Sequence, residues 1–316
     1  MKRRSVCYWL LLCVLTLVSC QELTVQPRKP IQFVPSSSVA VLSVDWQKVR
    51  TDNYLKAVVK GNEIEKLFHS LGLNDQQIDE LVAFGEPNDS GQETGGIILK
   101  GSFKAKPVIS ALKEQGWIED SYEGYTLYYS PAEDAWLVAL KSRMLVVGAR
   151  ASVESVIEVE KDPDASITSV ESIHTLVKRF DRSRPPVLMI LAFPQVYQDI
   201  GSAALDIASI LLDAAGLGPL GTLLDKIGFA KGLACSISRK GNSLPVELMV
   251  MMKDEEAAKF LSGSLNLLQG ISRGLPEEGM SQSDQEAMRT FQSMVISREK
   301  DVLSIKLVMA EEDLTR

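Results

Sequence analysis

The side chains most often used for catalysis and metal binding are sparse in this sequence. The 316 residues include two histidines, His69 and His174, and neither is joined by a second histidine or a cysteine at the spacing of metal ligands. Both histidines lie in stretches with the period of amphipathic helices, where surface or packing roles are common. The nucleophile motif G-x-S-x-G and the phosphate-binding P-loop motif do not occur. The sequence therefore predicts no catalytic residue and no metal site.

A glycine-rich stretch at residues 216–221 matches the G-x-G-x-x-G pattern of dinucleotide-binding loops. Such a loop follows a strand and opens a helix. Here the preceding residues 202–215 have a helical pattern, and Pro219 falls in the middle of the motif. We interpret the stretch as a helix end followed by a turn, so the sequence predicts no cofactor.

The amino-terminal stretch has the pattern of an export signal. Three basic residues at positions 2–4 are followed by an apolar run at residues 6–18, which is interrupted only by Thr16. A basic end followed by an apolar run of this length is typical of a secretory signal. The run is shorter than the stretch of about 20 apolar residues that a membrane-spanning helix needs.

The apolar run ends in Leu17-Val18-Ser19-Cys20, which places a small residue directly before a cysteine. This order resembles the lipobox of bacterial lipoproteins. The resemblance implies that the Cys20 thiol receives a diacylglyceryl group, that the chain is cut before Cys20 and that the new amino terminus is acylated. Acyl chains hold a protein on a bilayer, so the implied partner is a membrane and the implied location is the bacterial cell envelope. An ordinary cleaved signal and a retained single-span anchor are the alternatives.

The resemblance also bears on the residue directly after the cysteine, which is Gln21 here. In this family an aspartate at that position resembles the signal for retention in the inner membrane, so Gln21 favours the outer membrane. Cys7 and Cys13 would leave with the signal, and Cys235 would then be the only thiol after Cys20. The sequence therefore predicts no internal disulfide. Cys235 alternates with apolar residues along a predicted strand, where we expect a buried and unreactive thiol.

The charge of the chain restricts its partners. Without the basic residues at positions 2–4, the chain keeps 31 basic and 41 acidic residues, a net charge of −10. An acidic surface repels phosphate groups, and nucleic-acid binding needs a basic patch that we do not find. The sequence therefore excludes nucleic acid as an expected partner.

Composition and hydrophobic periodicity divide the chain into four parts. Residues 1–19 form the signal peptide, and residues 20–35 contain three prolines and are predicted to form an extended tether. Residues 36–183 form a first α+β unit and residues 184–316 a second one. The stretch Arg184-Pro185-Pro186 marks the boundary between them.

The two units share a predicted order of elements. In each, a buried strand, at residues 39–46 or 187–193, is followed by a long helical stretch, a strand that leads into a helix, and a final hairpin. This similarity at an offset of roughly 150 residues predicts an internal duplication, with two unrelated halves as the alternative. Alternation in the hairpins predicts an α+β fold of mainly antiparallel sheet, covered by helices on one face and exposed to solvent on the other.

Two local predictions concern the first unit. Asn74 followed by Gln77 has the pattern of a capping box, which predicts a short helix that continues to Phe84. Residues 86–93 are acidic and contain proline and glycine, so we expect an exposed turn that begins at Glu86.

The most apolar stretch after the signal runs from Ile200 to Leu224 and is predicted to form a helix hairpin in the core. If this hairpin encloses a cavity for a hydrophobic ligand, the small or branched side chains would line it. These residues are Ala203, Ala204, Ile207, Ile210 and Leu211.

These observations predict a lipid-anchored envelope protein that is not an enzyme and acts by binding or scaffolding, with other envelope proteins as partners. Two alternatives are a carrier or sensor of a hydrophobic ligand, with its pocket at residues 200–224, and a hydrolase whose site is scattered over the fold. In element order alone, the body resembles exported bacterial proteins of unassigned role, which implies no site residues. A filled core with a broad apolar surface patch would favour the binding module, and a dry pocket would favour the carrier.

Overall fold

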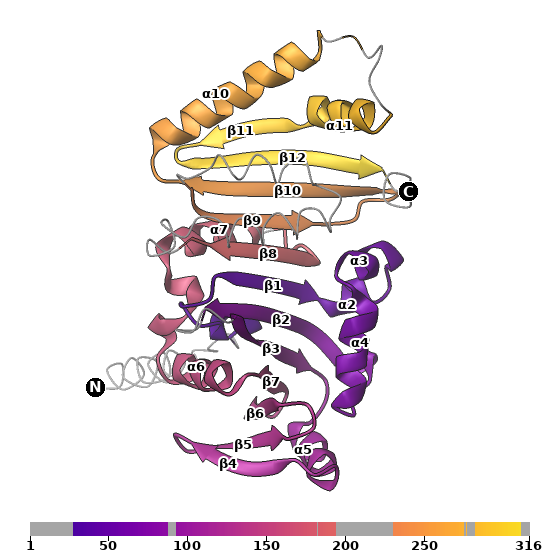
Figure 1. Ribbon diagram of the computed structural model, residues 1–316, viewed down its shortest axis with the longest axis vertical. Coiled ribbons are helices and arrows are strands. Elements are labelled where there is room, and N and C mark those ends of the chain that lie inside the picture. Colours follow the sequence, from indigo (N-terminus) through magenta and orange to yellow (C-terminus); the bar gives the residue numbers. More distant parts are fainter. Residues whose placement is uncertain are drawn as a thin grey trace, which may run out of the picture.

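Twelve strands pair into one antiparallel sheet in the computed structural model, which describes residues 28–87, 93–181, 183–193, 230–274, 276 and 282–310. The strand order is β11-β12-β10-β9-β8-β1-β2-β3-β7-β6-β5-β4 (Figure 1). The strands are β1 (Ala40–Asp45), β2 (Ile78–Pro87), β3 (Glu93–Gly101), β4 (Ile118–Tyr122), β5 (Tyr125–Ser130), β6 (Ala135–Lys141), β7 (Met144–Gly148), β8 (Val187–Ala192), β9 (Ala230–Ile237), β10 (Ser243–Met252), β11 (Val295–Glu299) and β12 (Val302–Ala310).

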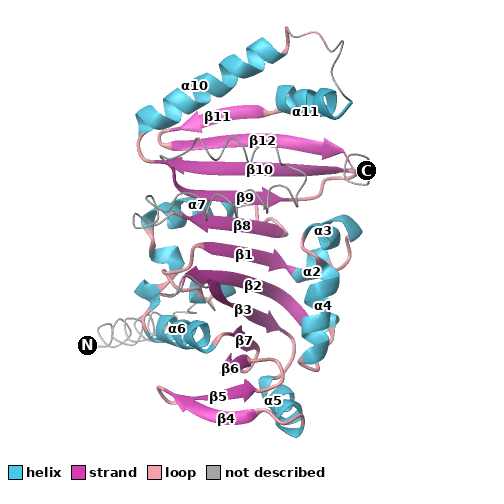
Figure 2. Cartoon of the chain, in the orientation of Figure 1, coloured by secondary structure: helices cyan, strands magenta, loops and turns pink. Residues whose placement is uncertain are grey.

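Helices flank this sheet on both faces (Figure 2). The α-helices are α2 (Trp46–Val49), α3 (Asn53–Val58), α4 (Gly61–Ser70), α5 (Ala105–Glu114), α6 (Arg150–Lys161), α7 (Glu171–Asp181), α10 (Glu255–Ser272) and α11 (Gln282–Ser293). The short 3-10 helices are η1 (Pro30–Phe33), η2 (Asp75–Gln77), η3 (Pro163–Ala165) and η4 (Ile167–Ser169). The predicted α+β fold class with a mainly antiparallel sheet is confirmed.

The central strands are buried on both faces. In β2, the neighbouring residues Leu81 and Val82 point to opposite faces, and each is 1% exposed. In β10, Leu248 and Met249 are likewise both buried. Helices α2 to α5 and α10 pack on the face of Leu81 and Leu248, and α6 and α7 pack on the face of Val82 and Met249. The prediction of one solvent-exposed sheet face is therefore wrong for these strands, because helices cover both sides.

The two predicted units meet at the centre of the sheet. Strands β1 and β8 pair there, with Leu42 opposite Met189. Outward from β1 the order is β2, β3, β7 and β6, and outward from β8 it is β9, β10, β12 and β11, while β5 and β4 extend the first half only. In each half a helix, α5 or α10, connects the inner strands to the outer ones. This shared topology agrees with an internal duplication, and a common origin of the halves stays a prediction.

The predicted helix after Asn74 is wrong. The Asn74 side chain accepts a hydrogen bond from Gln76 N at 2.9 Å, and the Gln77 side chain accepts one from Asn74 N at 3.0 Å, so the expected capping box is present. It closes only the single turn η2. From Ile78 onward the chain pairs with β1 and β3 instead, because a strand between two partners satisfies its backbone groups while burying both of its faces.

Candidate functional site

The predicted lipid attachment residue, Cys20, lies outside the described residues. So do the glycine motif at residues 216–221 and the predicted ligand-lining residues, which are Ala203, Ala204, Ile207, Ile210 and Leu211. Among the residues that the structure describes, no helix has the length and hydrophobicity needed to span a bilayer. Two described surfaces bear on the predicted function: the point at which the amino-terminal segment joins the body, and the outer face of α10.

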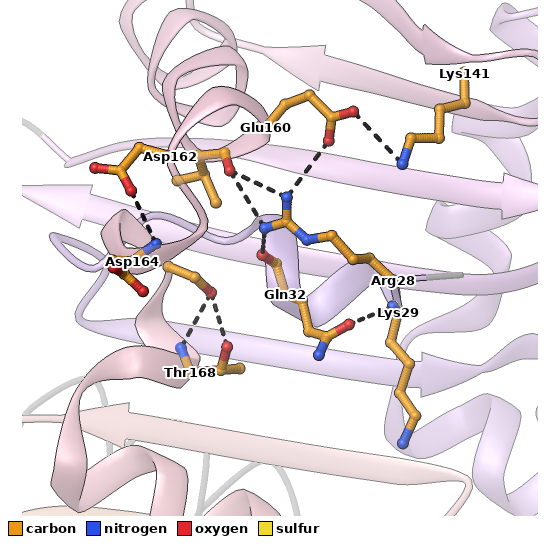
Figure 3. Close-up of polar contacts among 10 residues, drawn as sticks. Arg28, Lys29, Gln32, Lys141, Glu160, Asp162, Asp164 and Thr168 are labelled. Carbon is orange, nitrogen blue, oxygen red and sulfur yellow. Dashed lines mark hydrogen bonds and ion pairs between the residues drawn. The ribbon is translucent and has the colours of Figure 1, made fainter. Parts of the chain in front are cut away.

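Arg28 fastens the amino-terminal segment to the end of α6 (Figure 3). Its Nη1 and Nη2 atoms donate hydrogen bonds to the Val159 carbonyl oxygen at 3.2 and 3.3 Å, and Nη2 also donates to the Gln32 carbonyl oxygen at 2.6 Å. Val159 lies in the last turn of α6, where carbonyl groups have no partner within the helix and the helix dipole favours a cation. Arg28 therefore caps α6 from a position 131 residues away in the sequence.

Phe33 completes this junction. Its side chain is fully buried, with the Arg28 guanidinium 4.3 Å and the Lys141 ammonium 5.0 Å from the centre of its ring. Both cations also pair with Glu160, Arg28 at 3.6 Å and Lys141 at 3.5 Å. A cation over an aromatic ring is attracted to the ring face, and the shared carboxylate offsets one of the two positive charges. We call Arg28, Gln32, Phe33, Lys141 and Glu160 the amino-terminal clamp.

Backbone hydrogen bonds extend the clamp along the chain. Ile167 N donates to the Val34 carbonyl oxygen and Ser36 N donates to the Ala165 carbonyl oxygen, each at 2.8 Å. The structure thus differs from the predicted extended tether of residues 20–35, because residues 28–35 are docked on the body. The prolines indicated an extended chain, but the sequence did not reveal the partners of Arg28 and Phe33.

The inner face of α10 holds this helix against the sheet and α11. Asp254 caps the helix by accepting a hydrogen bond from Ala257 N at 2.8 Å. Leu265 is buried against the core. Gln269 is buried as well, and its amide nitrogen donates to the carbonyl oxygens of Phe291, Gln292 and Met294 at 3.0, 3.2 and 2.8 Å. These contacts fix which side of α10 faces outward.

The outer face of α10 is apolar. Phe260 is 77% exposed and Leu267 is 65% exposed, and Leu268 and Ile271 are each at least half exposed. Residues 260, 264, 267 and 271 recur at the spacing of one helix face. We call Phe260, Ser264, Leu267 and Ile271, with the adjacent Leu268, the outer stripe of α10. A contiguous apolar surface of this kind is typical of a contact site.

A hollow of about 530 Å³ lies along the outer stripe. It is open to solvent and exists because Gly263 and Ser264 have little or no side chain between the large residues Phe260 and Leu267. A Cβ atom added at Gly263 would meet no atom within 4 Å. Contacts within the described chain therefore do not explain this glycine.

The thiol and the histidines do not form a site. Burial raises the pKa of the Cys235 thiol to about 12, so the thiol is protonated and unreactive at neutral pH, as expected. His174 Nδ1 lies 3.2 Å from the Thr168 carbonyl oxygen. Over the described parts of the chain, no group of three or more His, Cys, Asp or Glu side chains could hold a metal ion.

Glu86 is a buried carboxyl that the sequence did not reveal. It was expected in an exposed turn, but it lies near the end of β2 and is 7% exposed. Ser37 Oγ donates a hydrogen bond to its Oε1 atom at 2.5 Å. Burial raises the pKa of the Glu86 carboxyl, and the hydrogen bond from Ser37 opposes that rise. Its burial follows from pairing in β2, which the local sequence does not indicate.

Comparison with known proteins gives no family for this chain. No family model matches it, and no curated protein matches it. Among solved structures, crystal form I of TP0453 is similar over 92% of this chain and 96% of that chain, with a TM-score of 0.49 and 12% sequence identity. Crystal form III of TP0453 is similar over 91% and 96%, with a TM-score of 0.44 and 11% identity.

Proposed function

We propose that this protein is a lipid-anchored component of the bacterial envelope, held at the outer membrane, that acts by binding a partner through the outer stripe of α10. The observation that carries the proposal is the exposed apolar face of α10. The lipobox-like stretch ending in Cys20 supports the anchor.

An apolar stripe that is exposed to water is thermodynamically unfavourable unless a partner covers it. Each large apolar side chain that moves from water into a contact gains on the order of 1.5–3 kcal/mol. The outer stripe contains four such side chains, Phe260, Leu267, Leu268 and Ile271. A partner that covers them gains free energy without any rearrangement of the sheet, because α10 is already fixed by Gln269.

The clamp supports a role at the membrane surface. If Cys20 is acylated, only residues 20–27 lie between the lipid and the clamp at Arg28. A fully extended chain of this length reaches at most about 29 Å. The body is then held close to the bilayer, where its partners would also lie.

The anchor is tested by replacing the thiol. Cys20→Ser is expected to leave the signal uncut, and mass spectrometry of the wild-type protein is expected to show acyl mass on Cys20. A mature amino terminus without added mass would contradict the anchor.

The contact surface is tested by placing a photoreactive side chain at position 267 in the anchored protein. Illumination of intact envelopes is expected to give a covalent adduct to a protein from this position. The control is the same side chain at position 110, an exposed serine on α5. Equal yields from the two positions would show that the outer stripe is not a contact surface.

A further inference from the structure

The outer stripe of α10 alternates large side chains with gaps. Phe260 and Leu267 project on either side of the hollow whose floor is Gly263 and Ser264. One turn beyond Leu267, Gly270 leaves a second gap, and a Cβ atom added there would meet no atom within 4 Å. Glycine weakens an exposed helix, so two glycines beside one stripe indicate that another backbone approaches this surface closely.

We infer that the partner that covers the outer stripe is α10 of a second copy of this chain, packed antiparallel, an assignment that rests on the proposed function of the stripe as a contact surface. In such a pair, each copy presents the same surface to the other, so the stripe must be complementary to itself.

The spacing of the stripe fits this requirement in one register. When Leu267 of one copy is level with Ser264 of the other, its side chain enters the hollow beside Gly263. In the same register Phe260 is level with Ile271 and lies beside Gly270. Leu267 therefore meets a gap near the centre of the contact, and Phe260 packs against Ile271 toward each end, which is how neighbouring helices interlock.

The charges at the two ends of α10 favour the antiparallel direction. The helix begins with Glu255 and Glu256 and is followed by Arg273. Antiparallel packing brings Glu256 of one copy near Arg273 of the other, and the two helix dipoles oppose each other. Parallel packing would place Glu256 beside Glu256.

The small size of the contact indicates where the pair forms. A stable interface in solution buries about 800 Å² on each partner, which is more than one helix face with four exposed apolar side chains provides. Chains anchored in the same membrane meet at a much higher effective concentration. The pair is therefore expected for the anchored protein.

The test uses single cysteines in the full anchored chain. Cys20 is acylated in the proposal and Cys235 is buried, so an added exposed thiol is the reactive one. In the antiparallel register two copies of residue 264 are offset by about 4.5 Å along the helix axis, and two copies of residue 256 by about 28 Å. Ser264→Cys is expected to give a disulfide-linked dimer in oxidised envelopes, and Glu256→Cys is not.

A second substitution shows whether the hollow is required. Gly263→Leu fills the hollow with a residue that favours helix, so it does not act by unfolding α10. Added to Ser264→Cys, it is expected to lower the yield of linked dimer at least about tenfold, because the opposing Leu267 can no longer enter. Unchanged yield would overturn the register.

The inference is overturned if Ser264→Cys gives no more dimer than Ser110→Cys on α5, or if Glu256→Cys gives as much. Together with the photoreactive side chain at position 267, the result separates two failures. An adduct to a different protein without a linked dimer overturns self-pairing and leaves the proposed function standing. The absence of both products overturns both.

Discussion

Helices α6 and α10 both pack on the sheet, but their outer faces differ. On α6, Val156 and Ile157 are fully buried, and the outer residue Arg150 pairs with Glu154 at 2.8 Å and with Asp120 at 3.0 Å. On α10, the outward positions are occupied by the apolar outer stripe. Charged pairs suit a helix face that remains in water, and an apolar stripe suits one that is covered.

The comparison locates the proposed contact surface in the second half of the sheet. The two helices pack on opposite faces of the sheet, and the counterpart of α10 in the first half is α5. The contrast between α6 and α10 therefore lies in the side chains that each helix presents outward. The first half carries the amino-terminal clamp at the end of α6, and the second half carries the outer stripe on α10, a helix that lies at the β11 end of the sheet (Figure 1).

The largest expected difference is in stability. Ile157→Ala on α6 is expected to lower the free energy of unfolding by about 2–5 kcal/mol, because it leaves a cavity in the core. Phe260→Ala on α10 is expected to change it by less than about 0.5 kcal/mol, because this side chain is exposed. Urea denaturation of both variants measures the contrast. A comparable loss in the two variants would place Phe260 in the core.

The next largest effect on the free energy of unfolding is expected from the amino-terminal clamp. Arg28→Ala removes the hydrogen bonds to Val159 and Gln32 and is expected to lower the free energy of unfolding by about 1–3 kcal/mol. Arg28→Lys keeps the positive charge near Phe33 but has no planar fork to bond both carbonyl groups, so an intermediate loss is expected. Wild-type stability in Arg28→Ala would mean that residues 28–35 are not docked.

A smaller and opposite effect is expected on α10. Gly263→Ala is predicted to raise the free energy of unfolding by up to about 1 kcal/mol, because alanine favours helix and the added methyl group meets no atom within 4 Å. Gly148→Ala is the matched contrast, since its Cβ atom would strike the Gly95 carbonyl oxygen. The midpoint temperature of thermal unfolding should rise for Gly263→Ala and fall for Gly148→Ala. A fall in both variants would contradict the open space at Gly263.

The smallest effect concerns how the stability of the fold depends on pH through Glu86, the carboxyl beneath α6. Because folding raises the pKa of Glu86 above its ordinary value of 4.5, the protonated form stabilises the fold, and this contribution is lost as the pH rises through the folded pKa. Glu86→Gln keeps the shape without the charge. The variant should match the wild type at about pH 4 and unfold at a higher temperature than the wild type at pH 8. A difference in unfolding temperature between the two proteins that stays the same from pH 4 to pH 8 would contradict the burial effect.

Much of the fold follows from local sequence. The alternation in β10 and β12, the buried strands at β1 and β8 and the start of α10 after Asp254 are all readable from periodicity and capping. Antiparallel pairing of the hairpins follows from the short turns between them. These features depend on neighbouring residues, which is why the sequence predicts them.

The features that the sequence did not indicate depend on distant partners. Asn74 has a sound capping pattern, yet pairing with β1 and β3 prevails over the local helix signal. Phe33 is buried by contacts with residues more than 100 positions away. On α10, apolar residues surround most of the helix, so periodicity alone cannot tell Leu265, which faces the sheet, from Leu267, which faces outward.

The position of the clamp also determines how an anchored copy would move. A chain tied at Arg28 pivots about the end of α6, so neighbouring copies in one leaflet would share the same pivot and the same restricted range of tilt. Weakening Arg28 would move the pivot to Ile31 and Phe33, which are buried in the body, and would lengthen the chain between the lipid and the pivot. Encounters between copies would then occur over a wider set of orientations and become less selective.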